Sequence, residues 1–166
     1  DRVNKALTTT QARQSNGWQL TFQLLLVNAN RQIGDLEAAE NAIRQVDAIM
    51  TVLKGSNAWS EWGANWTYQS ERARGEYYLT AGKAVAAELS FIRGLNAVEK
   101  RVEAVDAGLY KDSTRRVHSR QGIYFNKGII LARLANALFA QRKLTESEYY
   151  YRIALKTFLS VGTRNS

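Results

Sequence analysis

The chain has 166 residues, no proline and no cysteine, and a formal net charge of +8 from 23 Lys/Arg and 15 Asp/Glu. The missing prolines argue against turn-rich all-β folds and favour long helices, because a proline in a helix interior costs about 3 kcal/mol. The missing cysteines exclude disulfides, thiolate zinc sites, iron–sulfur clusters and a cysteine nucleophile. The length and a hydrophobic content of 45% suit one globular domain with its own core.

Six helices in three hairpins are predicted, and the first hairpin covers about residues 4–55. Its first helix would end at Gly34, and Asp35 would cap the second. The first helix is expected to bury an apolar stripe made of Trp18, Phe22, Leu25 or Leu26, and Ala29. In the second helix, steps of three and four between apolar residues indicate one buried face, made of Leu36, Ala39, Ile43, Val46, Met50 and Leu53.

The second hairpin covers about residues 59–108 and turns at Gly82. Helical spacing places Trp59, Trp62 and Trp66 on one side of its first helix. Packing in the core is the favoured interpretation of these indoles, and a carbohydrate platform or aromatic cage is the alternative.

The third hairpin covers about residues 114–162. A helix over residues 114–141 is predicted from its apolar periodicity. Thr145 and Glu148 have the spacing of a capping box, in which each side chain accepts from an amide at a helix start. The last helix is therefore expected to begin at Thr145.

The three interhelical turns superpose in sequence. Gly34, Gly82 and Arg142 occupy the same position, and each second helix carries a large residue at one place, namely Ile43, Phe91 and Tyr151. This pattern resembles the tetratricopeptide repeat (TPR), in which small residues let paired helices touch and an aromatic fills the next gap. The middle hairpin is the best match, through Gly75, Tyr78, Gly82, Ala87 and Phe91.

The resemblance covers about residues 20–160 and implies an all-α fold. The turns lie 48 and 60 residues apart, whereas the family repeats every 34 residues or so. The expected architecture is a divergent TPR-like α-solenoid of about three antiparallel helix hairpins, forming a single helical-repeat domain over residues 1–166. A generic helical bundle is the alternative fold.

Catalysis is not expected. The one histidine, His118, has arginine neighbours that disfavour its protonation and repel a metal ion. Neither a phosphate-binding glycine loop nor a metal-ligand set is present in the sequence. The carboxylate pairs have the spacing of solvated helix faces. We therefore predict a protein without enzyme activity, cofactor or metal.

The TPR resemblance implies that the first helix of each hairpin lines a concave groove that holds a protein or peptide partner. Carried over position by position, the groove residues would be Asn28, Arg31, Arg72, Glu76, Arg133 and Asn136. Asn28 and Arg133 match two members of the clamp by which some relatives hold a peptide carboxylate, whereas Leu24 and Ile129 replace its lysines. A partner held by mixed apolar and polar contacts is therefore expected.

A basic segment over residues 110–127 supports an alternative function. It contains the cations Lys111, Arg115, Arg116, Arg120 and Lys127, interleaved with Tyr110, Tyr124 and Phe125. Because cations attract phosphates and aromatic rings stack on bases, a basic helical nucleic-acid-binding domain is the alternative hypothesis.

The location of the protein is left open by the sequence. The chain begins with Asp1 and has its one methionine at Met50, so we expect a segment of a longer or processed protein. It would be cytoplasmic or, if a signal peptide was removed, periplasmic or secreted. The longest uncharged apolar run, Leu24 to Val27, is too short to span a membrane. Self-association through faces rich in tryptophan and tyrosine is also possible.

Overall fold

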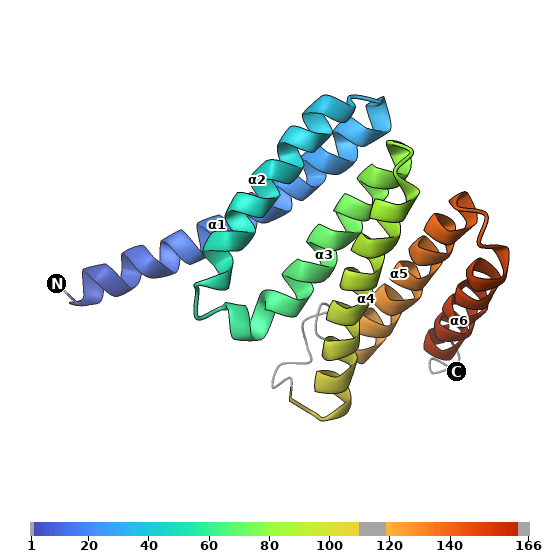
Figure 1. The fold of residues 1–166 in the computed structure, drawn as a ribbon. Helices are drawn as coiled ribbons and strands as arrows, with labels where there is room; N and C mark the ends of the chain where they lie inside the picture. Colours follow the sequence, from blue (N-terminus) through green and yellow to red (C-terminus); the bar gives the residue numbers. More distant parts are fainter. Residues whose placement is uncertain (1, 110–118, 163–166) are drawn as a thin grey trace. The chain divides into compact units, whose positions relative to one another are not determined.

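A computed structural model describes residues 2–109 and 119–162 of the chain. In these residues it contains six helices and no strand (Figure 1). The helices are α1 (Arg2–Ile33), α2 (Leu36–Lys54), α3 (Trp59–Thr80), α4 (Ala84–Asp106), α5 (Arg120–Ala140) and α6 (Leu144–Gly162). The predicted all-α class is confirmed.

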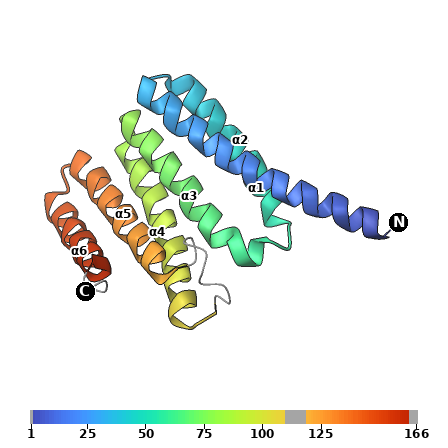
Figure 2. The same cartoon turned by 180° about the vertical axis from the view of Figure 1, so that it is seen from behind.

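The contacts within the chain gather in two compact units, Asp1–Trp66 and Thr67–Ser166, which divide inside α3. In the first unit α1 packs along α2. In the second unit α4 packs along α5, and α5 along α6, as both views of the ribbon show (Figures 1 and 2). Each unit therefore has its own helix-on-helix core.

The three interhelical turns share one backbone geometry. Gly34, Gly82 and Arg142 all have positive φ, at 84°, 72° and 62°. In each turn the next residue donates its N–H to a carbonyl five residues back, at 2.9, 2.8 and 3.0 Å respectively, as in the Schellman motif. The equivalence of the three turns, inferred from sequence, thus has a structural basis.

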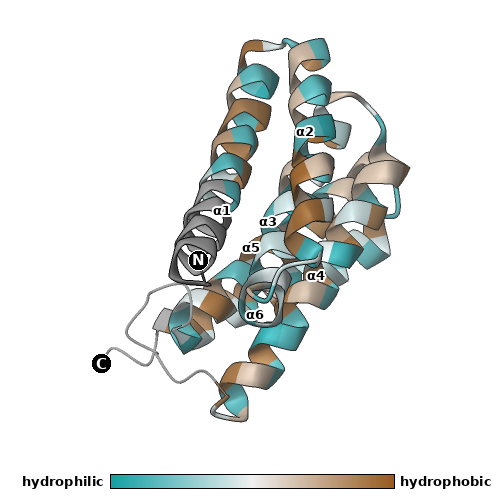
Figure 3. Ribbon diagram, turned by 90° about the vertical axis from the view of Figure 1, so that its left-hand side faces the viewer, coloured by the Kyte–Doolittle hydropathy of each residue, from teal (hydrophilic) through white to brown (hydrophobic). Residues whose placement is uncertain are grey.

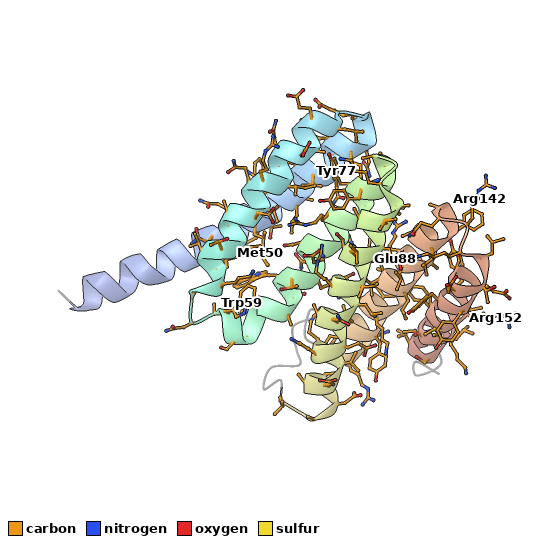
Figure 4. All side chains as sticks on the ribbon, viewed as in Figure 1. Met50, Trp59, Tyr77, Glu88, Arg142 and Arg152 are labelled. Atoms are coloured by element: carbon orange, nitrogen blue, oxygen red, sulfur yellow. The ribbon has the colours of Figure 1, made fainter. Side chains whose placement is uncertain are left out.

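Arg142 is the one non-glycine residue with positive φ among the described residues, and its side chain projects away from the turn (Figure 4). A side chain in this backbone region destabilises the folded state by about 1–2 kcal/mol. Glycine avoids this cost, but it also makes the unfolded chain more flexible, which offsets part of the gain. Arg142→Gly is therefore expected to raise the free energy of unfolding by about 0.5–1 kcal/mol. Urea denaturation measures it, with Gly82→Ala as the opposite substitution, expected to lower stability. Equal stability of Arg142→Gly and the parent would contradict the strain.

The predicted start of the last helix is wrong. Helix α6 begins at Leu144, and the Lys143 carbonyl accepts from the Ser147 amide at 3.0 Å. Thr145 therefore lies inside the first turn, and Glu148 pairs with Arg152 at 2.6 Å instead of completing a capping box. Helix α5 begins at Arg120, where the Ser119 hydroxyl accepts from the Gly122 amide at 3.1 Å, and residues 114–118 of the predicted helix lie outside the described residues.

The predicted inward face of α1 is also wrong. In the part of α1 whose side chains are described, residues 16–33, Leu20, Leu24 and Val27 are buried, whereas Trp18, Phe22 and Leu25 are exposed. Helix α1 has apolar residues on more than one side, interrupted by polar ones (Figure 3). Packing against α2 uses only one of these sides, which periodicity alone does not identify.

Glycines allow close contact within the hairpins of the second unit. A Cβ atom added at Gly75 on α3 would lie 2.4 Å from the Phe91 ring on α4. One added at Gly128 on α5 would lie 2.5 Å from the Phe158 ring on α6. Between hairpins, α4 and α5 share a buried cluster that includes Ala87, Phe91, Val98, Ile130, Leu134 and Leu138. In the second hairpin the contact joins two residues of the predicted pattern, Gly75 and Phe91, whereas in the third it joins Gly128 to Phe158 and not to the expected large residue, Tyr151.

Candidate binding surface

Three of the six predicted groove residues meet in the second unit. Glu76 on α3 accepts ion pairs from two sides, with its Oε1 atom 3.7 Å from Arg72 Nε and 3.3 Å from Arg133 Nε. The Glu76 side chain is only 10% exposed, whereas both arginines are partly exposed. A carboxylate at the base therefore holds two guanidinium groups at the surface, and we call these three residues the arginine pair site.

Tyr68 supports this site from below. Arg72 Nη1 donates to the Tyr68 hydroxyl at 3.2 Å, and the guanidinium lies 5.8 Å from the centre of the tyrosine ring. The hydroxyl in turn donates to the Asn126 side chain on α5 at 3.4 Å. Contacts along α3 thus orient Arg72 before any ligand binds. Binding then costs less side-chain entropy than it would for a freely rotating arginine.

Burial and neighbouring charges act in opposite directions on Tyr68 and Arg72. Burial raises the pKa of the Tyr68 phenol, although the charge and hydrogen bond of Arg72 oppose this rise. Burial also tends to lower the pKa of Arg72, but its contacts with Tyr68 and Glu76 outweigh this and leave the pKa raised. Two arginines against one glutamate give the arginine pair site a formal charge of one positive unit, which can attract a carboxylate or phosphate.

Helix α5 carries other exposed side chains besides Arg133. Phe139 lies six residues further along, about 120° around the helix from Arg133, and is exposed. Phe125, towards the other end, is 50% exposed and packs on Phe158 of α6, with 5.5 Å between ring centres. Asn136 lies between, and its side-chain oxygen accepts from the Tyr151 hydroxyl on α6. Helix α5 thus offers aromatic as well as charged side chains to solvent.

The predicted groove residues of the first unit lie apart from this site in the chain. Asn28 and Arg31 are both on α1 and both partly buried. Leu24, at the position of a clamp lysine, is buried in the core of this unit. The carboxylate clamp is therefore incomplete at Leu24 for two reasons. The residue is not a lysine, and its side chain points into the core and not to solvent.

Sequence reasoning did not single out Tyr68 or Asn126. Tyr68 precedes Arg72 by four residues, a spacing that places both on one side of a helix and that was available in the sequence. Asn126 comes from another helix, and its position depends on how α5 packs. Only the structure shows that contact.

The basic segment is partly outside the described residues, which include neither Lys111, Arg115 and Arg116 nor His118. The other two cations contact carboxylates on α4. Arg120 Nη2 lies 3.1 Å from Asp106, and Lys127 Nζ lies 2.8 Å from Glu99. Arg120 also lies over the Tyr124 ring, 5.5 Å from its centre. These two side chains join α4 to α5.

The three indoles cluster as predicted. Trp66 lies 6.2 Å from Trp59 and 6.4 Å from Trp62 between ring centres. All three side chains are partly buried, and Gly63 packs directly on the Trp59 ring. The cluster thus contributes to packing in the first unit, and its exposed part is still a candidate contact surface.

Comparisons with known proteins do not assign the chain to a family. No family model matches the chain, and searches of curated proteins and of solved structures also returned no match. Within residues 2–109 and 119–162, no group of three or more acidic, histidine or cysteine side chains could hold a metal ion. None of the described helices is both long and apolar enough to cross a membrane.

Proposed function

We propose that the protein is a non-catalytic interaction module that binds a peptide segment of a partner protein. The arginine pair site is the observation that supports it most directly. Two partly exposed guanidinium groups share one buried carboxylate. An incoming carboxylate can therefore approach both of them from solvent while Glu76 still holds them in place. The exposed Phe125 and Phe139 rings offer apolar contacts on the same helix as Arg133.

A TPR-like architecture is part of this proposal. It is supported by the three equivalent turns and by Gly75 packing on Phe91, which are the positions of the family's small and aromatic residues. In such an array the first helix of each hairpin faces the ligand. Arg72 and Arg133 lie on α3 and α5, the first helices of the second and third hairpins.

The partner segment is expected to contain an acidic group, either a side chain or a C-terminal carboxylate, next to an apolar residue. We predict that Arg72→Gln combined with Arg133→Gln weakens binding at least about tenfold, since a hydrogen bond to a charged group contributes about 1.5–3 kcal/mol. A displayed peptide library selected on the chain supplies the ligands, and fluorescence anisotropy measures their dissociation constants.

Arg44→Gln combined with Arg152→Gln is the matched control. It removes the same charge from exposed ion pairs on α2 and α6 and is expected to leave affinity unchanged. Equal weakening by the two pairs would show that only net charge matters. Selected peptides without acidic residues would contradict the proposed chemistry.

Nucleic-acid binding through residues 110–127 is the alternative proposal. The ion pairs favour the peptide-binding function. Arg120 and Lys127 are each balanced by a carboxylate of their own on α4, whereas Arg72 and Arg133 share the single carboxylate of Glu76. Titration with single-stranded RNA and DNA at low and high salt separates the two. Tight, salt-sensitive binding that the double substitution at Arg72 and Arg133 does not affect would favour the alternative.

A further inference from the structure

Helix α6 exposes the side chains that, in its counterpart α4, pack against the next hairpin. The equivalent turns at Gly82 and Arg142 pair each α4 residue with the α6 residue 60 positions later. Phe91 is fully buried and Leu95 packs on the same cluster. Their counterparts Tyr151 and Leu155 are 41% and 60% exposed. The α4 face that contacts α5 thus has an uncovered equivalent on α6.

Helix α1 shows the opposite half of the same contact. The turns at Gly34 and Arg142 pair it with α5, the helix on which α4 packs. Ile130 on α5 is fully buried, and its counterpart Phe22 is 59% exposed. Gln141 donates to the Ala84 carbonyl of α4, and its counterpart Ile33 is 77% exposed. The face of α1 that corresponds to the α4-covered face of α5 is therefore exposed.

A pocket beside this α1 surface corresponds to a filled position in the third hairpin. It has a volume of about 420 Å³ between α1 and α2, and its lining includes Leu26, Asn30 and Ala42. The α5 counterparts of Leu26 and Asn30 are Leu134 and Leu138, which are buried in one cluster with Phe91 of α4. The counterpart of Phe91 on α6 is Tyr151, an aromatic side chain of similar shape.

We infer that copies of this chain associate head to tail, with α6 of one copy packed on α1 of the next as α4 packs on α5. In this arrangement Leu155 covers Phe22. The exposed part of the Tyr151 ring, whose hydroxyl donates to Asn136 of its own chain, lies against the pocket at Leu26. The two contact surfaces differ, so the association is heterologous and can extend beyond a dimer. The second copy is the occupant because one chain presents both halves of an interface that it already forms internally, the α4-like face on α6 and the α5-like face on α1.

One charged pair of the α4–α5 contact is replaced by two like charges at this interface. In the α4–α5 contact Glu88 accepts from Lys143 Nζ at 2.9 Å (Figure 4). The counterparts are Glu148 on α6 and Asp35 at the turn after α1, which have the same charge. Glu148→Lys should therefore strengthen the association, because it places a cation near Asp35.

Sedimentation velocity of the 166-residue chain tests the inference. The weight-average mass should rise with concentration to twice that of one chain and beyond. Leu155→Glu should abolish this rise, and so should Phe22→Glu combined with Ile33→Glu. Leu89→Glu is the matched control, since Leu89 is an exposed α4 leucine outside the contact, and it should leave the association intact. Circular dichroism confirms that each variant is folded.

Mixing the two blocked variants distinguishes this arrangement from a symmetric dimer. The Leu155→Glu copy keeps its α1 surface and the Phe22→Glu/Ile33→Glu copy keeps its α6 surface. Each should be monomeric alone, and an equal mixture should form dimers and stop there. A parent chain that stays monomeric at all concentrations overturns the inference. So does dimerisation of the α1-blocked variant alone, which would indicate α6 packing on α6, or weaker association of Glu148→Lys.

Discussion

Phe91→Ala is expected to lower the free energy of unfolding of the second unit by about 3–5 kcal/mol. The Phe91 ring is fully buried, it packs on Gly75 within its own hairpin, and it belongs to the cluster that α4 shares with α5. Its removal leaves a cavity between three helices, and none of the neighbouring backbones can close it without breaking helical hydrogen bonds.

The distribution of tryptophans allows this loss to be assigned to one unit. All four tryptophans, Trp18, Trp59, Trp62 and Trp66, lie within the first unit. Urea unfolding followed by tryptophan fluorescence therefore reports the first unit, and far-ultraviolet circular dichroism reports both. If the units unfold independently, Phe91→Ala should shift only part of the dichroism transition. A shift of both signals together would show one cooperative domain.

Phe139→Ala is the control for this substitution, because it removes the same ring from an exposed position on α5. It is expected to change stability by less than about 0.5 kcal/mol. A loss as large as that of Phe91→Ala would contradict the burial difference between the two rings.

Gly75→Ala is expected to lower the free energy of unfolding by about 2 kcal/mol, against the usual direction for a helix interior. Alanine gains about 1 kcal/mol over glycine in helix propensity. Here the added methyl would meet the Phe91 ring at 2.4 Å, and overpacking of a filled core costs about 1–3 kcal/mol, occasionally more. The Phe91 ring is fully buried, so we expect the two helices to move apart.

Two further variants test the cause of this loss. Gly17→Ala makes the same change within α1, where the nearest side-chain atom would lie 4.0 Å from the new methyl, and it should stabilise the chain. Gly75→Ala combined with Phe91→Leu should lose less than the sum of the single changes, because the smaller leucine makes room for the methyl. If the losses in the free energy of unfolding were additive, the strain would not arise from the contact between the new methyl group and the Phe91 ring.

The helices and turns were predictable because their signals are local. Gly34 and Gly82 supply the positive φ that a Schellman turn requires, and Asp35 does cap α2 by accepting from the Ala38 amide. Arg142 has no such intrinsic preference, and its turn was found only by comparison with the other two. The face that α1 buries depends on the partner helix, so its exposed Trp18 and Phe22 were assigned to the wrong side.

The candidate site was predictable in part for a similar reason. Arg72 and Glu76 are one helical turn apart, and the equivalence of the turns at Gly82 and Arg142 gives Arg133 a comparable place on α5, so the sequence could name all three residues. The contact of Tyr68 with Asn126 spans 58 residues of sequence and follows from the packing of α3 and α5. No local pattern contains that information.

The glycine–phenylalanine contacts show how a hairpin of this kind can change length. Gly75 lies seven residues before its turn residue Gly82, and Gly128 lies fourteen before Arg142. Phe91 lies nine residues after Gly82 and Phe158 sixteen after Arg142, so these two separations also differ by seven. Seven residues return a helix to nearly the same face. The glycine–phenylalanine contact of the second hairpin therefore recurs in the third, one heptad further from the turn on both helices. Adding or deleting one heptad from each helix would therefore preserve both turn and packing, and so give hairpins of graded length from a single set of contacts.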